Sequence, residues 1–103
     1  MSVTALRGQV FRVDLRYGAK PWLIVSNNAR NRNLETFLAV RVTTDKHANV
    51  PTVVPLSPAD PLTGYVMVDD LIQLYRDELT VPLGAVSVQT MRAVSTAIRI
   101  ALP

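Results

Sequence analysis

Apolar and polar residues alternate along the first half of the chain in the pattern of a β-rich protein. From Val10 to Leu15 every second residue is apolar, which is the period of a half-buried strand. Residues 22–25 are apolar throughout, as in a strand covered on both faces, and Pro21 is expected as its first residue because proline cannot donate to a sheet ladder. Further strands are expected at residues 37–42, 53–56, 65–68, 71–74 and 79–81.

The remaining segments read as turns and one helix. Residues 26–33 are polar and asparagine-rich, which predicts a loop or a short irregular helix, and residues 57–64 are dense in turn formers. Ser87 is typical of a helix N-cap, and apolar residues follow it at helical spacing as far as Leu102. Many short strands before one terminal helix predict an α+β, mainly β fold, a small and strongly curved β-barrel with a C-terminal helix.

The size and hydrophobicity of the chain bear on its assembly. We expect a single domain over residues 1–103, because 11.3 kDa leaves room for one modest core. A hydrophobic fraction of 49% and a mean hydropathy of +0.20 are high for so small a protein. Surplus apolar surface often ends in a subunit interface, so we expect a homodimer. A monomer with an unusually rich core is the alternative.

Charge is distributed unevenly along the chain. Residues 1–46 contain eight basic and three acidic residues, a net charge of +5, whereas residues 47–103 contain three basic and five acidic residues, a net charge of −2. A basic front half suits a face that binds a polyanion such as RNA. Ordinary solvated surface charge is the alternative.

Conventional catalytic and metal-binding motifs are missing. The chain has no cysteine, and its one histidine, His47, lies in a predicted loop where a solvated role is expected. The adjacent acidic pairs Asp69-Asp70 and Asp77-Glu78 are interpreted as turn and surface charges, because neighbours on a strand point to opposite faces. We therefore expect no metal and no cofactor. With no signal peptide and no membrane-spanning run, a cytoplasmic location without membrane association is the default.

One stretch carries a family resemblance. A strand from Gly8 leads through Tyr17-Gly18 into Lys20-Pro21 and a second strand, and a third strand ends at Thr43-Thr44. This arrangement resembles the MazF/PemK-like toxins, which are sequence-specific endoribonucleases of type II toxin–antitoxin pairs. The resemblance covers nearly the whole chain and implies the family's SH3-like barrel with a C-terminal helix. In the first half the resemblance rests on specific residues, and in the second half it rests only on the general pattern of residue types.

The resemblance also implies two catalytic residues. In the family an arginine before a proline at the start of the second strand, and a threonine at the end of the third, act on the scissile phosphate. The matching positions are Lys20 and Thr43, so the arginine is a lysine here. Lys20 would exchange protons with the 2′-hydroxyl or the leaving 5′-oxygen, and Thr43 would hydrogen-bond a non-bridging phosphate oxygen. Without the resemblance, they would read as a solvated strand-end lysine and an ordinary strand threonine.

RNA recognition is expected from the residues around this pair. Single-stranded RNA is read by stacking on aromatic rings, hydrogen bonds to base edges and cations near phosphates. The candidate RNA-binding residues are Tyr17, Gly18, Asn27, Asn28, Arg30, Arg32, Arg41 and Thr44. Trp22 lies inside an apolar strand, so core packing is expected for it. Where many family members have a glutamine after an acidic residue, this chain has Asp70 after Asp69, a change expected to alter substrate choice.

The implied function is a metal-independent endoribonuclease toxin that blocks translation and growth. It would cleave single-stranded RNA, in mRNA or exposed tRNA or rRNA loops, to 2′,3′-cyclic phosphate and 5′-hydroxyl ends. The implied partners are a second copy of the chain and a cognate antitoxin whose acidic, disordered tail competes for the RNA groove. Two alternatives stay open at this point. One is a CcdB-like toxin that binds DNA gyrase without catalysis, and the other is a decayed relative that only binds RNA or antitoxin.

Overall fold

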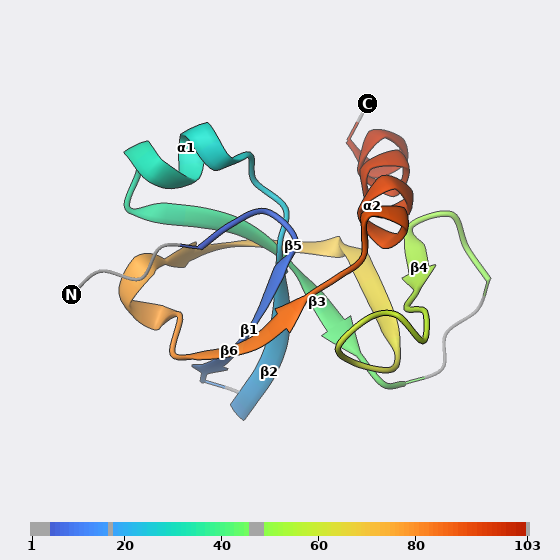
Figure 1. Ribbon diagram of the computed structural model, residues 1–103, viewed down its shortest axis with the longest axis horizontal. Helices are drawn as coiled ribbons and strands as arrows, with labels where there is room; N and C mark the ends of the chain where they lie inside the picture. Colours follow the sequence, from blue (N-terminus) through green and yellow to red (C-terminus); the bar gives the residue numbers. More distant parts are fainter. Residues whose placement is uncertain (1–4, 17, 46–48, 103) are drawn as a thin grey trace.

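The computed structural model describes residues 5–16, 18–45 and 49–102, which form one strongly curled antiparallel sheet with a C-terminal helix (Figure 1). Six strands lie in the order β4-β5-β3-β2-β1-β6. The elements are β1 (Gln9–Leu15), β2 (Gly18–Ile24), α1 (Asn28–Asn33), β3 (Thr36–Thr43), β4 (Val53–Pro55), β5 (Tyr65–Tyr75), η1 (Arg76–Glu78), β6 (Val81–Ala85) and α2 (Val88–Ala101). The predicted class, mainly β with a C-terminal helix, is confirmed.

Apolar side chains pack on both faces of the curled sheet. On one face, Val10, Leu23 and Val40 pack with Val94 of α2 in one buried cluster. Successive side chains of a strand point to opposite faces, so the neighbours of these residues fill the other side. There Phe11, Trp22, Phe37 and Leu74 belong to a second buried cluster. Trp22 is 6% exposed, which agrees with the core packing expected for it.

Pro21 ends the hydrogen-bond ladder between β2 and β3. β2 begins at Gly18 through its pairing with β1, three residues earlier than predicted, but its pairing with β3 is recorded only from Trp22 to Ile24. The backbone N–H of Val25 donates to Leu38 in β3 at 2.9 Å. Successive backbone nitrogens of a strand point alternately to its two neighbouring strands, so the nitrogen of Pro21, four residues before Val25, also faces β3. As a proline nitrogen it has no proton to donate. The proline therefore lets the two strands separate.

β5 is one long bent strand, where the sequence predicted two. Val40 of β3 pairs with Leu71, but the next residue, Arg41, pairs with Met67, so residues 68–70 of β5 are extra at this step. A bulge of this kind bends the strand and leaves the extra residues unpaired with β3. Of the three, Asp69 and Asp70 are exposed and Val68 is buried. The break predicted at Asp69-Asp70 is therefore a bend within a continuous strand.

The last strand differs from its prediction. β6 runs over Val81–Ala85, whereas the sequence predicted a strand at residues 79–81, and η1 precedes it. Pro82, within β6, has no N–H to donate to a sheet ladder. However, β6 is the edge of the sheet and pairs only with β1, and an edge strand tolerates a residue without an N–H.

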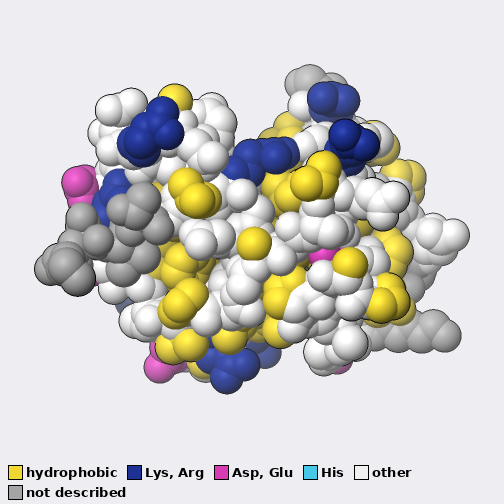
Figure 2. Space-filling view, viewed as in Figure 1, with side chains coloured by type: hydrophobic (Ala, Val, Ile, Leu, Met, Phe, Trp, Pro, Cys, Tyr) yellow, Lys and Arg dark blue, Asp and Glu magenta, His cyan; other side chains and the backbone are white. Residues whose placement is uncertain are grey.

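Basic side chains lie in separate groups on the surface. On the face drawn in Figure 2, Lys and Arg side chains lie along the upper edge, over α1 and α2, and again at the lower edge below β2. Apolar side chains are scattered between them. The two basic groups therefore lie at opposite ends of the sheet.

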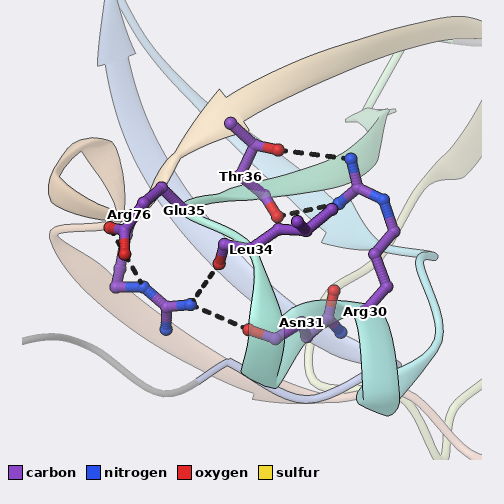
Figure 3. Close-up of polar contacts among 6 residues, drawn as sticks. All are labelled: Arg30, Asn31, Leu34, Glu35, Thr36 and Arg76. Carbon is purple, nitrogen blue, oxygen red and sulfur yellow. Dashed lines mark hydrogen bonds and ion pairs between the residues drawn. The ribbon is translucent and has the colours of Figure 1, made fainter.

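Two arginines attach α1 to the sheet (Figure 3). Arg76 donates to the carbonyl oxygens of Asn31 and Leu34, and its guanidinium lies 4.9 Å from the ring centroid of Phe37. Arg30 donates to the carbonyl and the hydroxyl oxygens of Thr36 at 2.8 and 3.2 Å. The bonds from Arg76 satisfy carbonyl groups at the end of the short helix α1, and those from Arg30 tie the helix to β3.

Candidate active site

β2 and β3 separate on the N-terminal side of Trp22, and a small hollow lies at this end of their ladder. Trp22 pairs with Arg41, and continuing this antiparallel register by two residues brings Lys20 opposite Thr43. Both residues line the hollow, which has a volume of about 260 Å³. The lysine and the threonine that the sequence singled out therefore border the same cavity.

The hydroxyl group of Thr43 is held by the turn that follows it. The backbone N–H of Asp45 donates to Thr43 Oγ1 at 3.2 Å, and the side chain is 7% exposed. Since the oxygen already accepts a bond, its own proton is the part of the hydroxyl left to donate. Thr43 is thus positioned as a hydrogen-bond donor at the wall of the hollow.

Two cations face the space beside Thr43. Lys20 is exposed and Arg41 is half-buried, and both line the small hollow. Within the described residues neither has an ion-pair partner. A half-buried guanidinium without a carboxylate partner favours a bound anion, because charge in a partly dehydrated site is stabilised by a counter-charge. Asp45, an exposed carboxylate, also lines the hollow, so two positive charges and one negative charge border it. The positive balance favours binding of a phosphate.

A second, larger hollow adjoins the first. The bend of β5 opens a cavity of about 710 Å³ that Lys20, Arg41 and Trp22 line from one side and Asp69 and Asp70 from the other. Lys20 and Arg41 border both hollows, so the two cavities are neighbours that share these side chains. The residue pattern led us to interpret the two aspartates as turn and surface charges, whereas the family resemblance indicated an effect of Asp70 on substrate choice. The signal that could have revealed them is an acidic pair interrupting an otherwise apolar strand.

The other candidate RNA-binding residues divide into two groups. Gly18 lines the larger hollow and Thr44 the smaller one, and Tyr17 lies outside the described residues. The remaining four lie in or next to α1, at the end of β2 away from Lys20 (Figure 1): Asn27, Asn28, Arg30 and Arg32. The structure does not bring this second group to either hollow.

Three members of the α1 group have structural contacts. The side chain of Asn27 accepts from the backbone N–H of Arg30 at 2.9 Å, as an N-cap, and that of Asn28 accepts from the N–H of Arg7 at 2.7 Å. Arg30 is bonded to Thr36 as described above. Arg32 is exposed. The asparagine-rich segment therefore has a clear role in forming and anchoring α1.

Residues 6–102 match the family of PemK-like, MazF-like toxins of type II toxin–antitoxin systems. The chain belongs to this family. The resemblance read from the first half of the sequence is therefore confirmed, and as a MazF-like toxin the chain is assigned to the endoribonucleases.

Individual relatives agree with this assignment. The MazF-like chain is 56% identical over 97 residues to Endoribonuclease MazF4 of Mycobacterium tuberculosis, an alignment that covers 94% of this chain and 91% of that protein. It is 54% identical, with a TM-score of 0.92, to a solved mycobacterial endoribonuclease in complex with its cognate antitoxin, covering 96% of this chain and 97% of that one.

More distant MazF structures share the fold. A MazF from Deinococcus radiodurans, solved in a MazE–MazF complex, superposes with a TM-score of 0.83 at 20% identity, covering 97% of this chain and 96% of that one. At this identity the similarity concerns the fold alone. In the described part of this MazF-like chain, no helix has the length and hydropathy needed to cross a bilayer.

Proposed function

We propose that this toxin cleaves single-stranded RNA without a metal ion, through attack of the RNA's own 2′-hydroxyl, and that the small hollow holds the scissile phosphate. The observation that carries the proposal is that Lys20 and Thr43 border one cavity where β2 and β3 separate. An adjacent cation and hydroxyl suffice to stabilise the charge that develops on the phosphorus oxygens. The products would be a 2′,3′-cyclic phosphate and a 5′-hydroxyl end.

Each residue of the hollow has a defined part in this reaction. The 2′-oxygen forms a bond to phosphorus while the bond to the 5′-oxygen breaks, so one proton must leave the 2′-oxygen and one must reach the 5′-oxygen. Lys20 exchanges a proton with one of these oxygens, and solvent water exchanges a proton with the other. Thr43, its oxygen held by the Asp45 N–H, donates to a non-bridging phosphate oxygen. Arg41 compensates the remaining negative charge.

The bound strand would continue beyond the hollow in both directions. Gly18 and Thr44 border the hollows and would contact the nucleotides next to the cut. Asn27, Asn28, Arg30 and Arg32 would contact RNA several nucleotides away, because β2 spans roughly 23 Å at about 3.3 Å per residue. Cations at that distance hold phosphates and set the position of the strand.

The proposal includes two protein partners and a location. A cognate antitoxin with an acidic tail would compete with RNA for the cations of the hollow, and the solved antitoxin complex of a 54% identical relative supports such a partner. A homodimer would place a groove between two copies of the sheet. Both the RNA and the antitoxin would be met in the cytoplasm.

Cleavage of a defined RNA by purified variants tests the proposal. Thr43→Val keeps the shape of the side chain but removes the donor, so the cleavage rate should fall about 10²–10³-fold, as for other oxyanion donors. Thr43→Ser keeps the hydroxyl and should stay within about tenfold of the parent protein. Lys20→Ala should cost about 10²–10⁴-fold, in the range of a lost acid–base group.

The same assay measures the chemical groups at the ends of the RNA products and whether cleavage requires a metal ion. Addition of EDTA should leave the rate unchanged, and the upstream fragment should carry a cyclic phosphate that acid treatment opens. A rate that EDTA abolishes would contradict the metal-free route. If the protein arrests growth while cellular RNA stays intact, and Thr43→Val arrests growth as well, the nuclease proposal is contradicted. A toxin that acts by binding alone is then favoured.

A further inference from the structure

We propose that the larger hollow binds one nucleobase next to the scissile phosphate, accepting bases with an exocyclic amino group and rejecting uracil. The inference rests on the proposed function, since it concerns the nucleotide adjacent to the cut. The cavity measures about 710 Å³ and shares Lys20 and Arg41 with the small hollow. A base attached to a phosphate in the small hollow can therefore enter it.

The walls of the larger hollow suit a flat aromatic ring. Leu15, Leu71 and Ile72 are half-buried apolar side chains that line it together with Trp22. Bases in single-stranded RNA are unstacked and bind where apolar or aromatic side chains cover their faces. Trp22 comes from β2 and Leu71 from β5, so the bend in β5 opens the cavity between apolar walls on two strands.

Two buried donors in these walls lack a partner. Within the described residues, neither the indole Nε1 of Trp22 nor the guanidinium Nε of Arg41 has a hydrogen-bond acceptor. Buried donors in folded proteins are nearly always paired, so these two are available to hydrogen-bond a ligand in the cavity beside them. A small rotation of either side chain toward the cavity would allow it to donate to a carbonyl or ring nitrogen of a base.

The opposite rim selects by charge. The bulge places Asp69 and Asp70 at the cavity, where Asp69 accepts from the hydroxyl of Thr52 at 2.7 Å. Asp70 is exposed and has no partner among the described residues. An ionised carboxylate only accepts hydrogen bonds, so it favours the amino groups of cytosine, adenine and guanine. It disfavours uracil, which has no amino group and presents a carbonyl oxygen on each side of its single N3–H donor.

Trp22 is the only tryptophan of the chain, so its fluorescence reports directly on this cavity. We would titrate the full-length protein with short 2′-deoxy oligonucleotides of cytosine, adenine or uracil, which bind but cannot be cleaved. Cytosine and adenine should quench the fluorescence at concentrations at least tenfold lower than uracil. In Asp70→Asn, whose amide both donates and accepts, the difference between cytosine and uracil should narrow to within twofold.

Asp77→Asn is the matched control. Asp77 is exposed, does not line the hollow, and loses the same charge on substitution, so this variant should keep the parent preference. Equal quenching by uracil and cytosine in the parent protein, or an unchanged preference in Asp70→Asn, would overturn the base pocket. RNA cleavage without any base-dependent quenching would overturn the pocket alone. Base-dependent quenching in a protein that cuts no RNA would instead overturn the nuclease.

Discussion

At the scale of single residues, a glycine allows another backbone segment to pass close to the backbone of Thr43. Gly64 has a φ of +129°, and a Cβ atom added there would lie 2.2 Å from the carbonyl oxygen of Thr43. Tyr65, the next residue, pairs with Thr43 at the start of β5. Only a residue without a side chain permits this close contact, so the position of Thr43 depends on Gly64.

Gly64→Ala should therefore impair both stability and activity. We expect a loss of roughly 2–4 kcal/mol in the free energy of unfolding, from the close contact and the positive φ together. RNA cleavage should fall at least about tenfold, even where the variant is folded, because Thr43 is displaced from the phosphate. Urea denaturation and the initial cleavage rate measure the two effects.

Gly18→Ala separates the two causes of the stability loss. Gly18 also has a positive φ, +97°, but nothing lies within 4 Å of an added Cβ. It should lose only the conformational part, roughly 1–2 kcal/mol. If both variants lose the same stability, the contact with Thr43 is not what makes Gly64 necessary.

Two residues of the small hollow could be selected from the family resemblance, but their geometry could not be predicted. Lys20-Pro21 and Thr43-Thr44 could be assigned because they match a family pattern. That Pro21 ends the ladder toward β3 depends on which side of β2 its nitrogen faces, which only the pairing register decides. For the same reason, Asp69 and Asp70 could not be placed at a cavity before the bulge in β5 was known.

At the scale of elements, Asp60 connects the β4–β5 loop to the start of α2. Its carboxylate accepts from the backbone N–H groups of Ser57 and Ser87, each at 2.7 Å, and from the hydroxyl of Thr90 at 2.6 Å. Burial raises the pKa of Asp60, but these hydrogen bonds outweigh it and lower the pKa from 3.8 to about 2. The ionised form is thus favoured by the folded structure.

The stability contributed by Asp60 should depend on pH. Since the pKa is lower in the folded state, the stabilisation is present above the unfolded value near 4 and is lost as the pH falls toward 2. The difference in unfolding free energy between the parent protein and Asp60→Asn should be about 1–2 kcal/mol at pH 7 and should shrink below pH 4. Urea denaturation at pH 7, 5 and 3 measures it.

Asp14→Asn is the control for this series. Asp14 is an exposed carboxylate of β1 that does not anchor a helix, so its substitution should change stability by less than about 0.5 kcal/mol at every pH. A constant difference between the parent protein and Asp60→Asn from pH 7 to pH 3 would mean that ionisation of Asp60 does not stabilise the fold.

The sequence pattern predicted helices and strands correctly where buried residues recur at a regular spacing. The helix after Ser87 and the strand at residues 37–42 were predicted within one or two residues, because their apolar spacing is unbroken. Errors arose where a partner strand decides the outcome. β6 tolerates Pro82 because it is an edge strand whose recorded neighbour is β1. The local sequence does not reveal that it lies at an edge.

At the scale of the whole molecule, the fold leaves apolar side chains uncovered at one end of α2. Ile100 and Leu102 are 53% and 57% exposed, although the helix buries Met91 and Val94 on its inner face. Burying a side chain of this size contributes about 1.5–3 kcal/mol. In a dimer with a twofold axis, each residue is buried in both subunits and contributes twice. The end of α2 is therefore a suitable centre for the proposed homodimer.

The double variant Ile100→Glu, Leu102→Glu should separate the subunits. Sedimentation should give the parent protein twice the 11.3 kDa mass of one chain, and the double variant the mass of a single chain, because four carboxylates would meet at the axis. RNA cleavage should fall at least about tenfold, since a groove between two sheets holds RNA that one sheet cannot. Leu34→Glu, at an equally apolar exposed position beyond α1, should stay dimeric and active. A parent protein that sediments as a monomer while cutting RNA would show that one sheet is enough.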